Sequence, residues 1–134
     1  MVRGILAVLA GLAVMGGLAV GMDTLVMKAM PGAFSPQGHT ESVAVLVFMF
    51  VYTLVYAGLG GFVTGAVARR RPVMHAVVLG VITWVLSVIN LVMMAGSVPP
   101  WWGVAMLVLV IPAVALGGRR AARRKASGGM PQAA

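Results

Sequence analysis

Four long stretches of this chain carry no charged side chain, and they constrain its fold more than any other feature. The first has 19 residues, 4–22, and at 1.5 Å per residue it just crosses a hydrocarbon core of about 30 Å. The second has 27 residues, 42–68, and a further 47 uncharged residues, 72–118, are divided by the Gly/Pro-containing segment 96–100. This pattern predicts an all-α integral membrane bundle of four transmembrane helices at about 4–28, 43–68, 73–95 and 101–118, followed by a basic cytoplasmic tail over 119–134.

The positions of the basic residues predict how the chain crosses the membrane. Nine of the 10 Lys and Arg residues fall on one side of the four stretches, and only Lys28 falls on the other. Because loops rich in Lys and Arg stay in the cytoplasm, we expect both termini there, in a multi-pass protein of the bacterial inner membrane. Trp101 and Trp102 fall at the opposite boundary, where indole rings are favoured, and we expect them to be interface anchors.

The net charge of +8 raises the alternative of nucleic-acid binding. The basic residues, however, adjoin the predicted span ends, where anionic lipid attracts Lys and Arg. We therefore expect membrane lipids as partners, and no nucleic acid. The residues expected to contact anionic headgroups are Arg69, Arg70, Arg71, Arg119, Arg120, Arg123, Arg124 and Lys125.

The composition of the spans argues against catalysis. Cysteine is absent, which excludes disulfides, thiolate metal sites and a cysteine nucleophile. No Ser, His and carboxylate occur at matched depth for nucleophilic catalysis. An enzyme would have to use the loop residues His39 and Glu41, whose spacing relative to Asp23 matches no defined metal site. We expect no enzymatic activity, no catalytic residue, no cofactor and no bound metal.

A line of small and polar residues runs along one face of the third predicted helix. Gly80, Thr83, Ser87 and Asn90 recur at spacings of three, four and three, which places them on one side of a helix. We favour a packing interpretation, in which the three polar side chains hydrogen-bond to neighbouring helices and Gly80 permits close approach. The alternative is that this seam lines a path for a small solute.

Two further faces are built from small residues four apart. They comprise Ala13, Gly17 and Gly21 on the first helix and Ala57, Gly61 and Gly65 on the second. Small residues at this spacing let helix backbones approach closely, so we expect both faces to pack against other helices. The motif does not decide between contacts inside the bundle and contacts in a homo-oligomer.

Asp23 is the single acid within or beside a predicted span. An intramembrane carboxylate indicates an ion or proton site. Its place near the outer end of the first helix also fits a side chain that water satisfies. Tyr52 and Tyr56 lie deep in the second helix, so their hydroxyls need partners, and Asn90 is a candidate for Tyr52.

The second half of the chain resembles a known group on glycine, proline and turn residues. These are Gly60-Gly61, Arg70 to Pro72, His75-Ala76, Gly80, Asn90-Leu91, Pro100-Trp101, Pro112 and Leu116 to Gly118. Over about half its length the chain is similar to a widespread group of uncharacterised small four-span bacterial membrane proteins. In similar proteins the first helix often ends with an acid and a nearby histidine. Asp23 matches the acid, but no histidine precedes His39. The resemblance implies the fold and no particular activity.

These observations favour a small non-enzymatic membrane protein whose glycine-rich faces bind other transmembrane helices. Such a protein would be an accessory or structural subunit of a larger membrane complex, or a homo-oligomer. The alternative is an oligomeric transporter or channel for a small solute, using Asp23 and the seam of Gly80, Thr83, Ser87 and Asn90.

Overall fold

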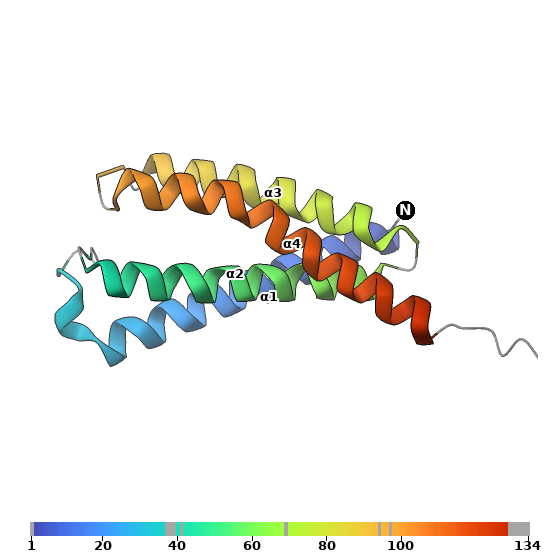
Figure 1. Cartoon of the computed structure of the whole chain (residues 1–134), viewed down its shortest axis with the longest axis horizontal. Helices are drawn as coiled ribbons and strands as arrows, with labels where there is room; N and C mark the ends of the chain where they lie inside the picture. Colours follow the sequence, from blue (N-terminus) through green and yellow to red (C-terminus); the bar gives the residue numbers. More distant parts are fainter. Residues whose placement is uncertain are drawn as a thin grey trace, which may run out of the picture.

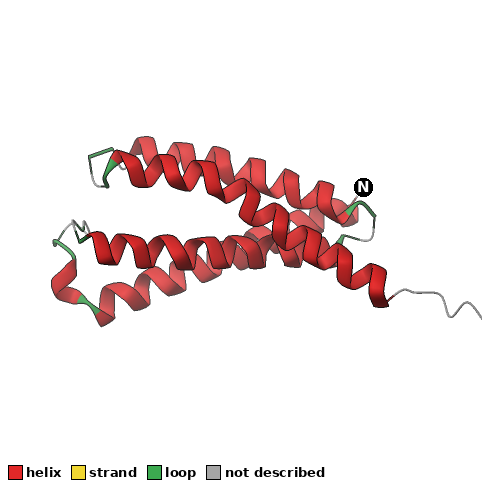
Figure 2. Ribbon diagram, in the orientation of Figure 1, coloured by secondary structure: helices red, strands yellow, loops and turns green. Residues whose placement is uncertain are grey.

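The structure is a computed structural model that describes residues 2–36, 40, 42–68, 70–93, 95–96 and 98–128. It contains four long helices, α1 (Val2–Ala29), α2 (Val43–Val67), α3 (Pro72–Met93) and α4 (Pro100–Gly128), and a short 3-10 helix, η1 (Pro31–Ala33) (Figures 1 and 2). All four long helices have the length and apolar composition needed to cross a membrane. The chain is therefore an all-α protein of the multi-pass membrane type.

Proline, glycine and one strained residue set the helix ends. Pro72 and Pro100 stand at the first positions of α3 and α4, where a missing backbone N–H costs nothing. The short turn between α2 and α3 places Arg71 at φ 50°, in the left-handed region. Gly96 takes φ 91° in the α3–α4 loop, a conformation that favours glycine.

The fourth helix is longer than the sequence predicts, because it continues through the basic segment to Gly128 rather than ending near residue 118. Ala, Arg and Lys dominate this segment and are strong helix formers. The Lys125 ammonium donates to the carbonyl of Gly65 at 2.9 Å and to that of Ala68. Carbonyls at a helix C-terminus lack helical partners, so Lys125, for which we expect contact with lipid headgroups, also caps α2.

The α2–α4 contact is the most extensive in the bundle, and glycine permits it. A methyl group added at Gly61 would overlap the backbone carbonyl of Val114, and one at Gly117 would overlap the carbonyl of Gly58. Ala57, on the same predicted face of α2 as Gly61, is fully buried. Close packing of this kind is the main source of helix association in lipid.

The first helix packs through a different set of residues from the one predicted. Gly11 faces α2, where an added methyl group would overlap the Thr64 hydroxyl and lie 2.7 Å from the Gly60 carbonyl oxygen. Ala13 is exposed, and methyl groups on Gly17 or Gly21 would meet no atom of the described chain within 4 Å. Residues two apart lie ~200° apart around a helix, so turning Gly11 toward α2 turns the predicted face away. Gly17 and Gly21 thus make no close helix contact within the described chain, and contact of this face with other transmembrane helices stays a prediction.

The two helical hairpins, α1–α2 and α3–α4, are close together near the N-terminus and diverge toward the end where η1 lies (Figure 1). At the close end, Gly65 packs on Gly118 and Ala121, and Gly118 in turn packs on Ala76 of α3. His75 lies against Gly4 of α1. The bundle is thus tied together at one end, and the other end holds the space in which the candidate site lies.

Candidate functional site

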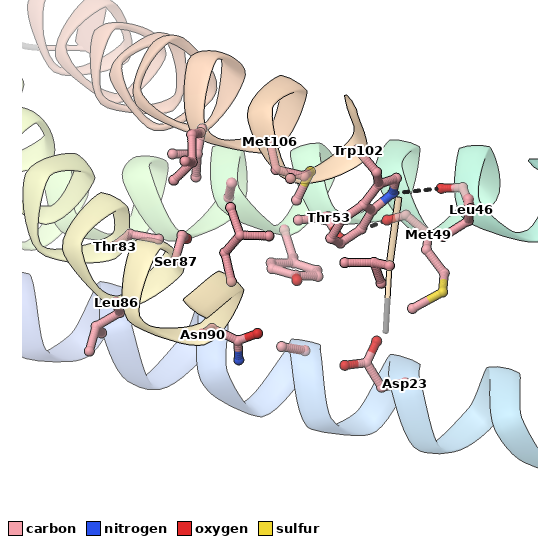
Figure 3. Close-up of a pocket in the computed structure, with 18 of the residues that line it drawn as sticks. Asp23, Leu46, Met49, Thr53, Thr83, Leu86, Ser87, Asn90, Trp102 and Met106 are labelled. Atoms are coloured by element: carbon pink, nitrogen blue, oxygen red, sulfur yellow. Dashed lines mark hydrogen bonds between the residues drawn. The ribbon is translucent and has the colours of Figure 1, made fainter. Parts of the chain in front are cut away.

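A cavity of about 390 Å³ lies between the hairpins and is lined by residues from all four long helices (Figure 3). Met15, Ala57 and Val110 line its deep end, and these residues also belong to the hydrophobic core cluster. Toward the loops the lining reaches Phe34, just after η1, and Val98, before α4. The core therefore closes the cavity on one side, and the lining on the other side extends to the connecting loops.

Asp23 lines the cavity from α1 and is partly buried. Its Oδ1 accepts a hydrogen bond from the Tyr52 hydroxyl of α2 at 2.5 Å. Figure 3 shows the carboxylate pointing from α1 toward the space between the hairpins. Within the described ranges, no Lys or Arg forms an ion pair with Asp23. Its charge therefore faces the cavity without a compensating basic side chain.

Tyr52 has a different partner from the one that the sequence suggested. The assignment of Asn90 to Tyr52 is wrong, because the Tyr52 hydroxyl donates to Asp23. Antiparallel packing of α1 on α2 brings these two residues together, whereas Asn90 belongs to the other hairpin. The Tyr52 ring also contacts Phe48 edge-on, with centroids 5.5 Å apart, and Tyr56 at 6.1 Å. These ring contacts hold the Tyr52 hydroxyl against the carboxylate.

Three of the four seam residues line the same cavity as Asp23, namely Thr83, Ser87 and Asn90 (Figure 3). The Thr83 hydroxyl donates to the carbonyl of Leu79 in its own helix at 2.8 Å, with the Met15 sulfur 3.9 Å away. Gly80 does not line the cavity, and a methyl group added there would lie 3.7 Å from the backbone of Ile111 in α4, an ordinary van der Waals contact.

The expected hydrogen bonds from this seam to neighbouring helices are missing. Neither Ser87 nor Asn90 makes a side-chain hydrogen bond to another residue in the part of the chain that the structure describes. Ser87 is partly buried and Asn90 is exposed, and both residues line the cavity. The described residues therefore do not show the hydrogen bonds that the packing interpretation expects at Ser87 and Asn90.

Aromatic side chains form part of the cavity wall. Phe34, Tyr56 and Trp102 line the cavity and are each partly buried. The indole N–H of Trp102 donates to the Leu46 carbonyl of α2 at 3.1 Å, linking α4 to α2 near the loops. Trp102 thus points inward from the position where we expected an interface anchor, while the neighbouring Trp101 is half-exposed.

The remaining predicted residues lie away from the cavity. Arg70, Arg71, Arg119, Arg120, Arg123 and Arg124 are exposed at the end of the bundle opposite η1. Arg69, His39 and Glu41 lie outside the described residues.

Several residues that line the cavity were not predicted from the sequence. Phe34, Met49, Thr53 and Met106 carry no motif and adjoin the cavity only through the tertiary packing. Tyr56 carried one usable signal, since a tyrosine deep in a span needs a polar environment. The divergence of the hairpins, on which the cavity depends, has no local sequence signature.

No family model, curated protein or solved structure matches this chain. The resemblance to small four-span bacterial proteins therefore stays a prediction. What the site can bind is therefore inferred from the residues that line it. One carboxylate, an amide, two hydroxyl-bearing residues of α3 and a partly aromatic wall can hold a ligand that combines positive charge with apolar surface.

Proposed function

We propose that this protein binds a small monovalent organic cation in the cavity between its hairpins, as the binding step of its transport across the membrane. The observation that carries the proposal is that Asp23, the single acid of the described chain, lines the cavity together with Phe34, Tyr56 and Trp102. A carboxylate attracts the charge, and aromatic faces attract both a cation and its apolar substituents.

The balance of polar and apolar groups favours an organic cation over a hydrated metal ion. A metal ion needs several oxygen or nitrogen ligands, and among the described residues no three His, Cys, Asp or Glu side chains cluster. The wall instead offers Met15, Met49 and Met106, whose flexible thioethers adapt to apolar ligands of varied shape. Ser87 and Asn90 add hydrogen-bonding capacity for a polar substituent.

The one-sided shape of the cavity favours a carrier over an open channel. The hydrophobic core and the glycine contacts between α2 and α4 close the bundle beyond Met15, Ala57 and Val110. Carriers of the alternating-access type present their site to one side at a time. With both termini in the cytoplasm of a bacterial cell, as the basic residues predict, the cavity of this state would face the extracytoplasmic side.

Binding is tested with benzyltrimethylammonium and its neutral isostere neopentylbenzene, which share shape and differ in charge. The reporter is the fluorescence of Trp102 in a protein whose other tryptophans are replaced by W84F and W101F. We expect Asp23→Asn to weaken the binding of the cation about tenfold or more, equivalent to ~1.4 kcal/mol or more. The amide oxygen can still accept the Tyr52 hydrogen bond, so the variant removes charge while keeping the local geometry.

The matched control is Tyr52→Phe, which removes the hydrogen bond but leaves the carboxylate charge. We expect this variant to retain cation binding within a few-fold, and the neutral isostere to bind both variants alike. Uptake of the cation into proteoliposomes should fall with Asp23→Asn in the same proportion. Equal affinity of native protein and Asp23→Asn for the cation would overturn the proposal.

A second candidate function is membership of a helical assembly, as an accessory subunit or a homo-oligomer. The exposed α1 face favours it, because Ala13, Gly17 and Gly21 present small residues with open space beside them. Mass measurement of the complex extracted in mild detergent tests this function. Gly17→Leu with Gly21→Leu should release the chain as a monomer, and an unchanged mass would count against a role for this face.

A further inference from the structure

A second hollow lies on the exposed surface of the bundle, between α2 and α4, and has a volume of about 800 Å³. Gly58, Ala113 and Gly117, which have little or no side chain, line it where the two helices meet. Pro112 lies beside these residues in α4. The walls are otherwise mainly leucine, valine and phenylalanine, so the surface is that of an apolar groove.

Two guanidinium groups, those of Arg120 and Arg124, line one end of this groove. Arg124 lies over the ring of Phe62 in α2, 5.4 Å from its centroid, in a cation–π contact that positions the charge beside the groove. Arg119 and Arg123 occupy the same stretch of helix and do not line the groove. The positive charge at the end of the groove therefore comes from Arg120 and Arg124, on one side of α4.

The length of the groove matches one leaflet of a bilayer. From Leu109 to Arg124 the helix advances ~22 Å at 1.5 Å per residue. Half of a bilayer, headgroups included, is also about 20–22 Å thick. A single lipid molecule can thus lie along the groove with its phosphate at the two arginines.

We propose that the α2–α4 groove is a specific site for an anionic phospholipid. An acyl chain lies beside Gly58 and Pro112, and the phosphate accepts hydrogen bonds from Arg120 and Arg124. Guanidinium groups bind phosphate oxygens in a bidentate geometry, which lysine does not offer. The site is independent of the cavity that contains Asp23, since the two hollows share no lining residue.

The test measures retained lipid by native mass spectrometry after exchange into bilayer discs of equal parts phosphatidylglycerol and phosphatidylcholine. Arg120→Gln with Arg124→Gln should lower the occupancy of phosphatidylglycerol roughly tenfold. Arg119→Gln with Arg123→Gln removes the same charge from the same helix segment and should leave the occupancy near that of the native protein. Equal losses in the two double variants would overturn the proposal and indicate a diffuse charge effect.

The apolar part of the site is tested separately. Leu109→Trp narrows the groove from its exposed rim, and Val108→Trp adds the same side chain at a neighbouring exposed position outside it. We expect lower lipid occupancy only for Leu109→Trp. Inorganic phosphate at millimolar concentration should not displace the lipid. Displacement by phosphate, or equal occupancy in both tryptophan variants, would show an anion site without a lipid-binding groove and contradict the proposal.

Discussion

The two ends of this bundle use the same four helices in opposite ways. At the end near the N-terminus, glycines in α2 and α4 bring backbones together so closely that an added methyl group would overlap a carbonyl. At the η1 end the hairpins diverge, and large side chains such as Tyr56 and Trp102 surround a cavity. The comparison shows how a short chain can be closely packed at one end and enclose a cavity of about 390 Å³ at the other.

Lys125 at the close end and two polar residues of the cavity differ in their hydrogen bonding. Near the close end, Lys125 satisfies the last carbonyls of α2 and so contributes to the fold. In the cavity, Ser87 and Asn90 make no side-chain hydrogen bond to any described residue. Ser87 is partly buried, and a polar group without a partner in such a place costs free energy, which is a reason to expect a ligand or water beside it.

The largest effect on stability is expected from a larger side chain at the glycine contact between α2 and α4. Gly61→Val would place side-chain atoms on the Val114 carbonyl, and since backbone atoms cannot swing aside, we expect a loss of ~3 kcal/mol of stability or complete loss of the fold. Gly21→Val, which has open space around it, should change stability by less than about 0.5 kcal/mol. Unfolding in mixed detergent, followed by circular dichroism, measures both, and similar losses in the two variants would refute the contrast.

A smaller effect is expected at the cap of α2. Lys125→Met keeps the apolar stem and removes the donor to the Gly65 and Ala68 carbonyls, so we expect about 1 kcal/mol of destabilisation. Arg123→Met, an exposed charge on the same turn, provides the control for altered charge. The same unfolding assay measures both variants. Equal free energies of unfolding for Lys125→Met and Arg123→Met would show that the cap does not stabilise the protein.

The smallest effect on stability is expected at the end of the bundle where the hairpins diverge. Trp102→Phe removes the hydrogen bond to the Leu46 carbonyl and keeps an aromatic ring, which should cost about 0.6 kcal/mol, the average for a hydrogen bond between helices in a membrane. Trp84→Phe, on α3 and partly exposed, is the reference. A loss at Trp102 as large as that at Gly61 would mean that the open end contributes as much to stability as the glycine contact.

The order and type of the elements could be predicted from the sequence, because length and lack of charge are local properties. The helices α1, α2 and α3 start and end close to their predicted bounds. The helix α4 starts close to its predicted bound, but its basic segment remains helical to Gly128. The spacing of small residues did not show which face packs. Gly61 and Gly65 pack on α4 and Ala57 is buried, while Ala13, Gly17 and Gly21, at the same spacing, are exposed. The rotation of each helix depends on its neighbours, and that information is not local.

The candidate site could be predicted only in part. Asp23 and the polar seam were recognisable as groups that lipid disfavours, and three seam residues share a cavity with Asp23. The Asp23–Tyr52 hydrogen bond and the inward direction of Trp102 depend on the register of α2 against α1 and α4. The spacing of residues within a single helix cannot predict that register, because it depends on how neighbouring helices pack.

The absence of native cysteine makes one measurement especially direct. Ser87→Cys places a single thiol in the cavity, and Thr64→Cys places one where the native side chain is fully buried at the α1–α2 contact. Both are treated with a membrane-impermeant maleimide, with and without benzyltrimethylammonium. We predict that Cys at position 87 reacts from one side of the membrane and is protected by the cation, while Cys at position 64 does not react. Equal inertness of both thiols, or reaction at position 87 that the cation leaves unchanged, would contradict a ligand-binding cavity.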